Sequence, residues 1–121
     1  MSKVLVVEDS LTQREMISTL LKKIGLKVTV ACDGVEAMEQ IQASCPDLVV
    51  LDIIMPRMNG YEVCRKIKSD SKTKNLAVVM CSAKKEEFDR YWGMKQGADA
   101  YIAKPFHPQE LLGTVKHLLR E

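Results

Sequence analysis

Short apolar runs alternate along the chain with segments of helical periodicity. The runs are rich in Val, Leu and Ile, are bounded by polar or turn residues, and cover residues 3–7, 27–31, 47–51, 76–81 and 100–103. The first, third and fourth are apolar almost throughout, which is typical of central parallel strands that are covered on both faces. The pattern therefore predicts five strands in an α/β domain.

The segments between and after these runs carry apolar residues three or four positions apart, as on one face of a helix. The four clearest stripes are Ile17, Leu20, Leu21 and Ile24; Val35, Met38 and Ile41; Tyr61, Cys64 and Ile67; and Leu111, Leu112, Val115, Leu118 and Leu119. Ser10 stands where a helix would need an N-cap, and Gly25 and Gly97 stand where helices would end. Each strand is thus predicted to be followed by a helix.

Five successive βα units with right-handed crossovers give a doubly wound parallel sheet. We expect a flavodoxin-like (βα)5 fold with strand order 2-1-3-4-5, formed by one domain over residues 1–121 without a second domain. In such sheets the ligand site lies outside the carboxyl ends of the strands. The topology therefore predicts where the chemistry should be before any motif is considered.

Composition and charge exclude several classes of protein. A hydrophobic content of 46% and a charged content of 28% are ordinary for a globular domain, and a net charge of +2 with scattered Lys and Arg gives no case for nucleic-acid binding. The N-terminal apolar run is too short for a signal peptide or a membrane span, so we expect a cytoplasmic protein without membrane insertion. The four cysteines never form CxxC, and we expect them to be mostly small buried residues in a reducing compartment.

Three carboxylates are expected to meet at the carboxyl ends of two strands. Asp52 ends a strand that is otherwise apolar, and Glu8 and Asp9 directly follow the first strand. Like charges this close need a cation, and oxygen ligands without Cys or His favour a hard ion such as Mg²⁺. The sequence therefore predicts a Mg²⁺ site.

Two further strand ends supply the remaining parts of a phosphoryl-transfer site. Lys104, after the fifth strand, adds a positive charge, and Ser82, after the fourth, adds a hydroxyl donor. Together with Mg²⁺ these groups could surround the oxygens of a transferring phosphoryl group. Asp52 would then be the attacking nucleophile, and the product would be an acyl phosphate.

These residues belong to motifs that resemble the receiver domains of two-component response regulators over the whole chain. The matching motifs are "VEDS" (7–10), "LDIIMPRMNG" (51–60), "CSA" (81–83) and "AYIAKPF" (100–106). Because no output domain is expected, the chain is similar to the stand-alone CheY-like regulators of chemotaxis. The segment "DRYWGMKQGADAY" (89–101) looks more specifically like the PilH group of pilus motility and phototaxis regulators.

The resemblance implies a role for each site residue. Asp52 would accept a phosphoryl group from a histidine kinase or phosphotransfer protein, Lys104 would contact the phosphate, and the phosphorylated surface would bind a downstream protein target. Mg²⁺ would be held by Glu8, Asp9, Asp52 and the backbone carbonyl of Ile54. Ser82 and Tyr101 would form a switch pair, with Tyr101 filling space that Ser82 opens by moving toward the phosphate. The Lys104-Pro105 peptide bond would be cis.

The resemblance also points to two positions that would set the lifetime of the phosphoryl group. In the family, fast self-dephosphorylation goes with side chains that hold a water, two residues past the aspartate and two past the hydroxyl residue. Here these positions are Ile54, which forms no hydrogen bond, and Lys84, which only donates and could lie across the entrance to the site. We therefore expect a long-lived phosphoryl group. The chain would promote its own phosphorylation and dephosphorylation without being an enzyme in the usual sense.

Three alternatives remain open from the sequence. A Mg²⁺-dependent phosphatase of the haloacid dehalogenase type would also use an aspartyl phosphate, but its nucleophile follows the first strand in a DxD pattern. A flavodoxin-type cofactor binder would need a phosphate-binding loop where this chain has "EDSLT" (8–12). A non-phosphorylated interaction module would not need the complete set of acidic, hydroxyl and lysine positions. His107 and His117 are expected at the surface, and Tyr91 or Trp92 on a partner surface.

Overall fold

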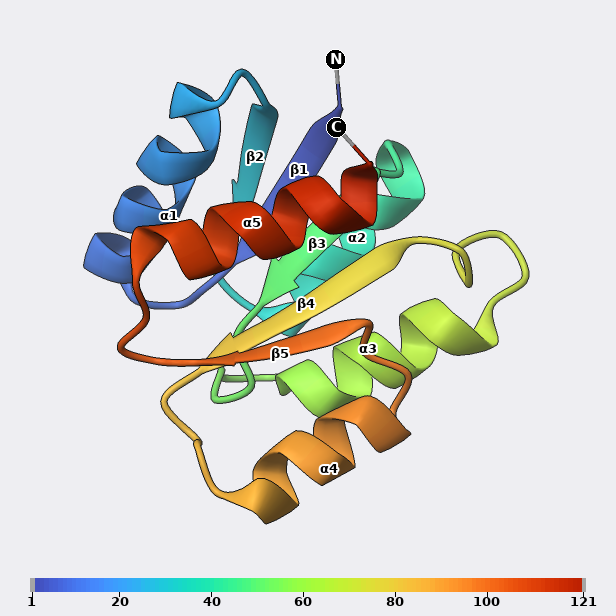
Figure 1. Cartoon of the computed structure of the whole chain (residues 1–121). Coiled ribbons are helices and arrows are strands. Elements are labelled where there is room, and N and C mark those ends of the chain that lie inside the picture. Colours follow the sequence, from blue (N-terminus) through green and yellow to red (C-terminus); the bar gives the residue numbers. More distant parts are fainter. Residues whose placement is uncertain (1, 121) are drawn as a thin grey trace.

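The computed structural model describes residues 2–120, which form alternating strands and helices (Figure 1). The elements in chain order are β1 (Lys3–Val7), α1 (Leu11–Lys23), β2 (Lys27–Ala31), α2 (Gly34–Ala43), β3 (Leu48–Leu51), α3 (Gly60–Ser69), β4 (Ala77–Ser82), α4 (Glu87–Lys95), β5 (Ala100–Ala103) and α5 (Pro108–Leu119). The five predicted βα units are thereby confirmed. The first, second and fifth strands have the predicted bounds, and the other two differ by one residue.

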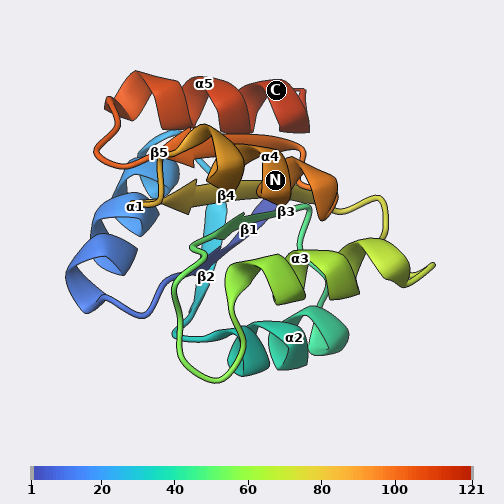
Figure 2. The ribbon, with the colours of Figure 1, turned by 90° about the horizontal axis from the view of Figure 1, so that it is seen from below.

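The strands form one parallel sheet in the order β2-β1-β3-β4-β5, as predicted. Helices α1 and α5 pack on one face of the sheet, and α2, α3 and α4 cover the other. Figure 2 shows α5 above the sheet and α2 and α3 below it. The order reverses between β1 and β3, so their carboxyl ends border the crevice where this fold binds its ligands.

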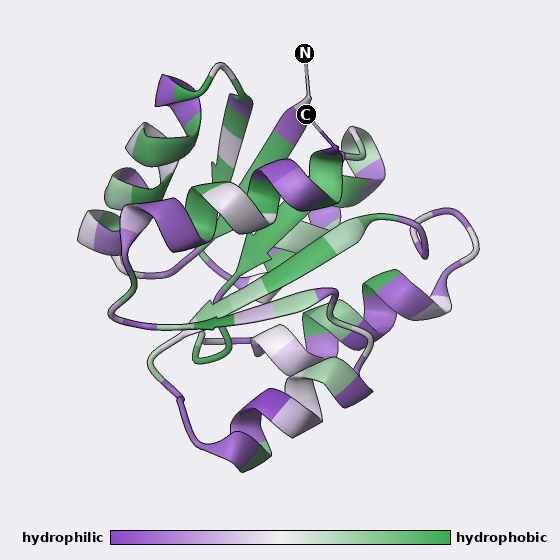
Figure 3. Cartoon of the chain, in the orientation of Figure 1, coloured by the Kyte–Doolittle hydropathy of each residue, from purple (hydrophilic) through white to green (hydrophobic). Residues whose placement is uncertain are grey.

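Alternate residues of the central strands enter two separate cores. Leu5 and Val7 of β1 face α2 and α3, whereas Val4 and Val6 face α1 and α5. Both sets are at most 1% exposed, which explains why β1 reads as a continuous apolar run. In Figure 3 the central strands are accordingly the most hydrophobic part of the ribbon. The edge strand β2 is less covered, and Val30 remains 41% exposed.

The predicted helix ends are confirmed. The Ser10 side chain accepts a hydrogen bond from the backbone N–H of Gln13 and caps α1. Gly25 and Gly97 have φ values of +89° and +103°, a backbone conformation that glycine adopts without steric cost. The Lys104-Pro105 peptide bond is cis, as the resemblance implied.

Two details of the predicted core are confirmed only in part. In α2 the buried residues are Gly34, Ala37 and Ile41, whereas Met38 packs against the core half-buried and Val35 is half-buried. Small Ala37 lets α2 lie close to the sheet, and periodicity counted over large residues misses it. Among the cysteines, Cys64 and Cys81 are buried as expected, but the other two, Cys32 and Cys45, are exposed because they lie outside the core-facing stripes. His107 and His117 are exposed, as predicted.

Gly60, the first residue of α3, packs directly against the strand end that carries Asp52. A Cβ atom at this position would overlap the carbonyl oxygen of Asp52 and lie 2.8 Å from the Cα of Ile53. We predict that Gly60→Ala lowers the free energy of unfolding by about 2 kcal/mol or more, because backbone atoms must move to admit the methyl group. Urea denaturation measures this change.

Gly113 offers a matched control in the interior of α5. Nothing lies within 4 Å of a Cβ built there, and the helix interior favours Ala over Gly. Gly113→Ala should raise the free energy of unfolding by about 0.5–1 kcal/mol. Equal effects of the two substitutions would contradict the close approach at Gly60.

Candidate functional site

The three predicted carboxylates come together at the carboxyl ends of β1 and β3. The register pairs Val7 with Leu51, so the residues that follow the two strands are neighbours. One carboxylate oxygen from each of Glu8, Asp9 and Asp52 lies within 4.8 Å of the others. Glu8 is buried and Asp9 is exposed, while the Asp52 side chain is 11% exposed. The cluster is therefore anchored in the protein and open to solvent on one side.

Lys104 reaches this cluster from the end of β5. Its ammonium lies 2.5 Å from Glu8 Oε2 and 3.5 Å from Asp52 Oδ2. The other Asp52 oxygen, Oδ1, accepts a hydrogen bond from the Ile53 backbone N–H at 2.7 Å. The Lys104 backbone N–H donates to the Ser82 carbonyl, which fixes the lysine beside the end of β4. Lys104 thus faces both acidic strand ends at once.

Burial and the hydrogen bond between Glu8 and Lys104 have opposite effects on the pKa of each of these two groups. Burial, together with the charge of Asp52, raises the pKa of Glu8 above its ordinary value, although the hydrogen bond from Lys104 opposes the rise. Burial alone would lower the pKa of Lys104, but its hydrogen bond to Glu8 and the charges of Asp52 and Glu8 raise it. Lys104 therefore stays an ammonium beside Asp52 at neutral pH.

Lys84 connects Ser82 and Tyr101, the two predicted switch residues. The Lys84 backbone N–H donates to Ser82 Oγ at 3.3 Å, and the Lys84 carbonyl accepts from the Tyr101 hydroxyl at 2.5 Å. Ser82 is fully buried and Tyr101 is 5% exposed. Burial raises the pKa of Tyr101 to about 12, so its hydroxyl remains a donor at neutral pH.

The movement of Tyr101 into space opened by Ser82 on phosphorylation stays a prediction. The ring already lies inside the protein, against α4: a Cβ built at Gly93 would be 3.1 Å from it. Because Gly93 lacks a side chain, the ring fits between β5 and α4 in this state.

The two residues predicted to control dephosphorylation lie in different loops, Ile54 after β3 and Lys84 after β4. Ile54 is 58% exposed in the loop after β3. The Lys84 ammonium forms an ion pair with Asp89 Oδ1 of α4, at 3.5 Å. The Asp89 carboxylate also accepts from the Glu86 backbone N–H and caps the helix. Lys84 thus links the loop after β4 to α4 through both backbone and side chain.

Sequence reasoning missed a contact between two loops beside the site. Asp33, a strand-end residue, does not join the acidic cluster but caps α2 and accepts hydrogen bonds from Arg57 Nε and Nη2 at 3.0 and 2.8 Å. The Glu36 backbone N–H and then Arg57 lower the pKa of Asp33. Arg57 has a φ of +67°, and no short-range pattern signals such a turn with its distant partner. The pair fastens the loop after β3 to the start of α2.

The acidic cluster fits a hard divalent cation. Glu8, Asp9 and Asp52 offer oxygen atoms alone, which suits Mg²⁺, an ion that commonly binds through few carboxylates and keeps several waters. The exposure of Asp9 and of Ile54 leaves room on the solvent side for those waters. The donor set of Glu8, Asp9 and Asp52 thus fits the predicted ion, and the backbone carbonyl of Ile54 stays a predicted ligand.

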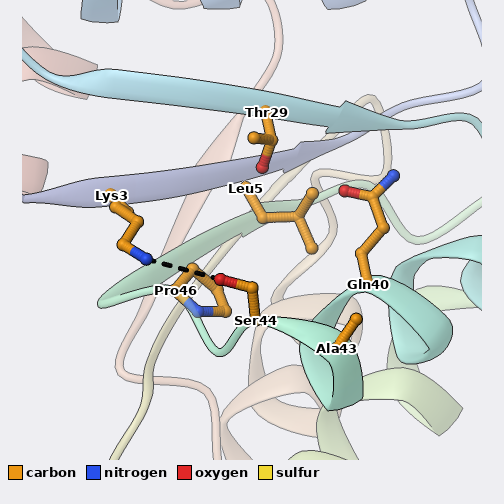
Figure 4. Close-up of a pocket in the computed structure, with 7 residues that line it drawn as sticks. All are labelled: Lys3, Leu5, Thr29, Gln40, Ala43, Ser44 and Pro46. Atoms are coloured by element: carbon orange, nitrogen blue, oxygen red, sulfur yellow. Dashed lines mark hydrogen bonds between the residues drawn. The ribbon is translucent and has the colours of Figure 1, made fainter.

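The cavity in Figure 4 lies elsewhere. It has a volume of about 170 Å³ and is bordered by Leu5, Thr29, Gln40 and Ser44, near the middle and amino-terminal parts of β1 and β2. Lys3 at its margin donates to Ser44 Oγ at 3.4 Å. The cavity therefore opens away from the carboxyl ends of the strands and has no part in the acidic cluster.

Comparison with known proteins agrees with this geometry. The family described as the response regulator receiver domain matches residues 4–116. The chain belongs to this family. It is 44% identical over 114 residues to protein PilG of Pseudomonas aeruginosa, covering 94% of this chain and 84% of PilG. It is also 41% identical to the probable transcriptional regulator ycf27 of Cyanophora paradoxa, where the match covers 98% of this chain but only 48% of the relative.

Solved receiver structures have the same fold. A putative response regulator from Chloroflexus aurantiacus superimposes with a TM-score of 0.95 at 35% identity, covering 99% of this chain and 98% of that one. The chemotaxis protein CheY4 of Vibrio cholerae gives 0.90 at 33% identity, with 98% of each chain covered. This receiver is therefore CheY-like in fold and part of two-component signalling. Within residues 2–120, no helix is both long and apolar enough to cross a bilayer.

Proposed function

We propose that this receiver is a signalling switch that is turned on by phosphorylation of Asp52. The observation that carries the proposal is the position of Asp52 between two other carboxylates and the Lys104 ammonium, at the end of a buried strand. Holding a third carboxylate so close to two others lowers the stability of the fold. Such a cost is typical of a functional site, here one that would bind a cation and a phosphoryl group. The buried Ser82 hydroxyl lies at the next strand end along the sheet.

The phosphoryl group would come from a phosphohistidine of a histidine kinase or phosphotransfer protein. A bond forms between an Asp52 carboxylate oxygen and phosphorus, and the P–N bond breaks, its electron pair returning to the imidazole nitrogen. Lys104 faces Asp52 Oδ2 and would bind an oxygen of the phosphoryl group. Ser82 would donate its hydroxyl to another. A bound Mg²⁺, held by Glu8, Asp9, Asp52 and the carbonyl of Ile54, would neutralise charge on the phosphoryl oxygens.

Phosphorylation would reach the surface through Lys84. Ser82 Oγ now accepts from the Lys84 backbone N–H, and a phosphoryl group would draw the Ser82 hydroxyl toward itself as a donor. Any shift of Lys84 acts on Tyr101, whose hydroxyl binds its carbonyl, and on α4, whose Asp89 binds its ammonium. The change would bias two arrangements of the surface formed by α4, β5 and α5, where a protein target would bind.

The similarity to PilG and to chemotaxis CheY4 supports a pathway of chemotaxis-like, phototaxis or type IV pilus motility control. We propose a cytoplasmic receiver that acts through proteins and not through nucleic acid. The assignment to the PilH group in particular remains part of this proposal.

Incubation with acetyl phosphate and Mg²⁺ tests the function against its rivals. A receiver gains one transient phosphoryl group on Asp52, which phosphate-affinity electrophoresis and intact mass both detect. A phosphatase of the aspartyl-phosphate type would instead release many equivalents of phosphate, and a flavin-binding protein or a purely structural interaction module would do neither. Release of many equivalents of phosphate, or the absence of both labelling and release, would contradict the proposal.

The phosphoryl group is predicted to last for minutes or longer. Ile54 cannot hydrogen-bond a water, and Lys84 is a donor already paired with Asp89, so nothing at these positions orients a water for attack. The double variant Ile54→Asn with Lys84→Glu should shorten the half-life about tenfold or more, because it adds acceptors beside the phosphate. Decay of phosphorylated protein after removal of the donor measures this.

Lys85, which neighbours Lys84 and is exposed, provides the control. Lys85→Glu makes the same change of charge in the same loop and should leave the half-life nearly unchanged. A wild-type half-life of seconds, or equal acceleration by Lys85→Glu, would show that the two positions do not set the rate.

A further inference from the structure

Helix α4 carries an unusual amount of exposed apolar surface for its length. Eight large hydrophobic side chains are exposed in residues 2–120, and four of them lie in this nine-residue helix. Phe88 is 63% exposed, Tyr91 61%, Trp92 41% and Met94 43%, while Gly93 is the only buried residue of the helix. We call Phe88, Tyr91 and Trp92 the α4 patch. Figure 1 shows α4 at the margin of the molecule, with β5 and α3 on its inner side.

Charges of opposite sign lie at equal distances on either side of this patch. Glu87, Tyr91 and Lys95 are four residues apart and so share one stripe of the helix, which points away from the buried Gly93. Glu87 forms no ion pair within the described chain, and the Lys95 ammonium lies 5.9 Å above the Tyr91 ring. Acid near the start of a helix and base near its end also suit the helix dipole. The helix dipole does not explain why both charges lie on the same stripe as Tyr91, at equal distances from it.

The aromatic row beside this stripe borders α3. Phe88 and Trp92 contact each other edge to face, with ring centroids 6.3 Å apart. Gln96 shows which flank of α4 faces α3, because its side-chain oxygen accepts a hydrogen bond from the Arg65 guanidinium of α3. Trp92 precedes Gln96 by one helical turn and therefore lies along this flank. The patch thus extends from the outer stripe of α4 toward α3, away from β5.

We propose that the α4 patch binds the same patch of a second copy of this chain. With the two α4 helices antiparallel about a twofold axis at Tyr91, Glu87 of each copy faces Lys95 of the other, and the aromatic rings meet between them. A twofold interface requires such a self-complementary surface. A partner surface that is entirely acidic would be repelled by Glu87, and one that is entirely basic would be repelled by Lys95. A second copy in the antiparallel arrangement instead places an opposite charge at both ends.

The size of the patch indicates a weak dimer. Aromatic side chains have about 150–250 Å² of surface each, so the exposed parts of these three present roughly 300 Å² per copy. Even with the surrounding charged residues, the contact stays below about 1,200 Å², the range of transient complexes. The association needs no phosphoryl group, because the patch is exposed in this state.

Charge reversal tests the pairing directly. Sedimentation velocity of the unphosphorylated protein over a range of concentrations up to millimolar should show a reversible monomer–dimer equilibrium. Glu87→Lys and Lys95→Glu should each weaken dimerisation about tenfold or more, because like charges then face each other at both ends. An equimolar mixture of the two variants should restore dimerisation, since all the pairs across that interface are again of opposite sign. Glu39→Lys, at an exposed position of α2, should have no effect.

Trp92 supplies an independent signal because it is the only tryptophan in the chain. Its emission should shift to shorter wavelength as the concentration of wild-type protein rises, and Asp52→Asn should behave identically, which separates this proposal from phosphorylation. Circular dichroism confirms that the charge variants are folded. A monomer at every concentration, a dimer indifferent to charge reversal, or a mixture that stays monomeric would each overturn the proposal, as would a blue shift that appears only with anionic lipid vesicles.

Discussion

Replacing Asp52 with asparagine is expected to abolish phosphorylation by acetyl phosphate while leaving the protein folded. The amide has nearly the same shape but cannot act as the nucleophile. Of the neighbouring carboxylates, Glu8 is bound to Lys104, and Asp9 is expected to bind Mg²⁺. Losing one of three like charges also relieves repulsion, so the free energy of unfolding should not fall substantially. Phosphate-affinity electrophoresis and urea denaturation measure the two quantities.

Asp47 provides the matched control for this substitution. It directly precedes β3, the same strand that Asp52 follows, and is exposed. Asp47→Asn should keep full phosphorylation. Substantial labelling of Asp52→Asn, with labelling lost instead in a serine variant, would show that the nucleophile has been misassigned.

Removing Mg²⁺ is expected to slow phosphorylation about a hundredfold or more. Three carboxylates and an incoming phosphoryl group place several negative charges within a few ångströms, and Lys104 offsets only part of them. The initial rate with acetyl phosphate in excess EDTA, compared with the rate in millimolar Mg²⁺, measures the dependence. Adding Mg²⁺ back should restore the rate.

Asp9→Ala should reproduce much of this loss by weakening Mg²⁺ binding. A site with few protein ligands depends strongly on each carboxylate, and Asp9 is the one not engaged by Lys104. Glu15→Ala, which removes an exposed acid from nearby α1, should leave the Mg²⁺ dependence unchanged. An unaltered rate in EDTA would count against a metal at this cluster.

The acidic cluster was predictable because a topological rule fixes where strand ends meet. Continuous apolar runs identified β1 and β3, and polar residues directly after them had to fall at one edge of the sheet. Asp52 was conspicuous because a carboxylate directly after a buried strand is costly unless it has a use. Lys104 and Ser82 followed from the same reasoning at the neighbouring strands.

What the sequence could not predict depends on side-chain conformation and on contacts between distant residues. The inward position of Tyr101 requires the missing side chain of Gly93, on a different element. The ion pair between Lys84 and Asp89 depends on the rotamer of the long lysine side chain. Asp33 and Arg57 are 24 residues apart and meet only because two loops fold beside each other. Periodicity alone contains none of this information.

The chemical identity of the phosphorylated residue tests the central claim most directly. An acyl phosphate of aspartate is reduced by borohydride to homoserine, which peptide mass spectrometry can place in the chain. After treatment with acetyl phosphate and Mg²⁺, the account predicts homoserine at position 52 in wild-type protein and none when Mg²⁺ is removed. Homoserine at Asp9, or a phosphate that resists both borohydride and mild base on a serine or threonine, would contradict it.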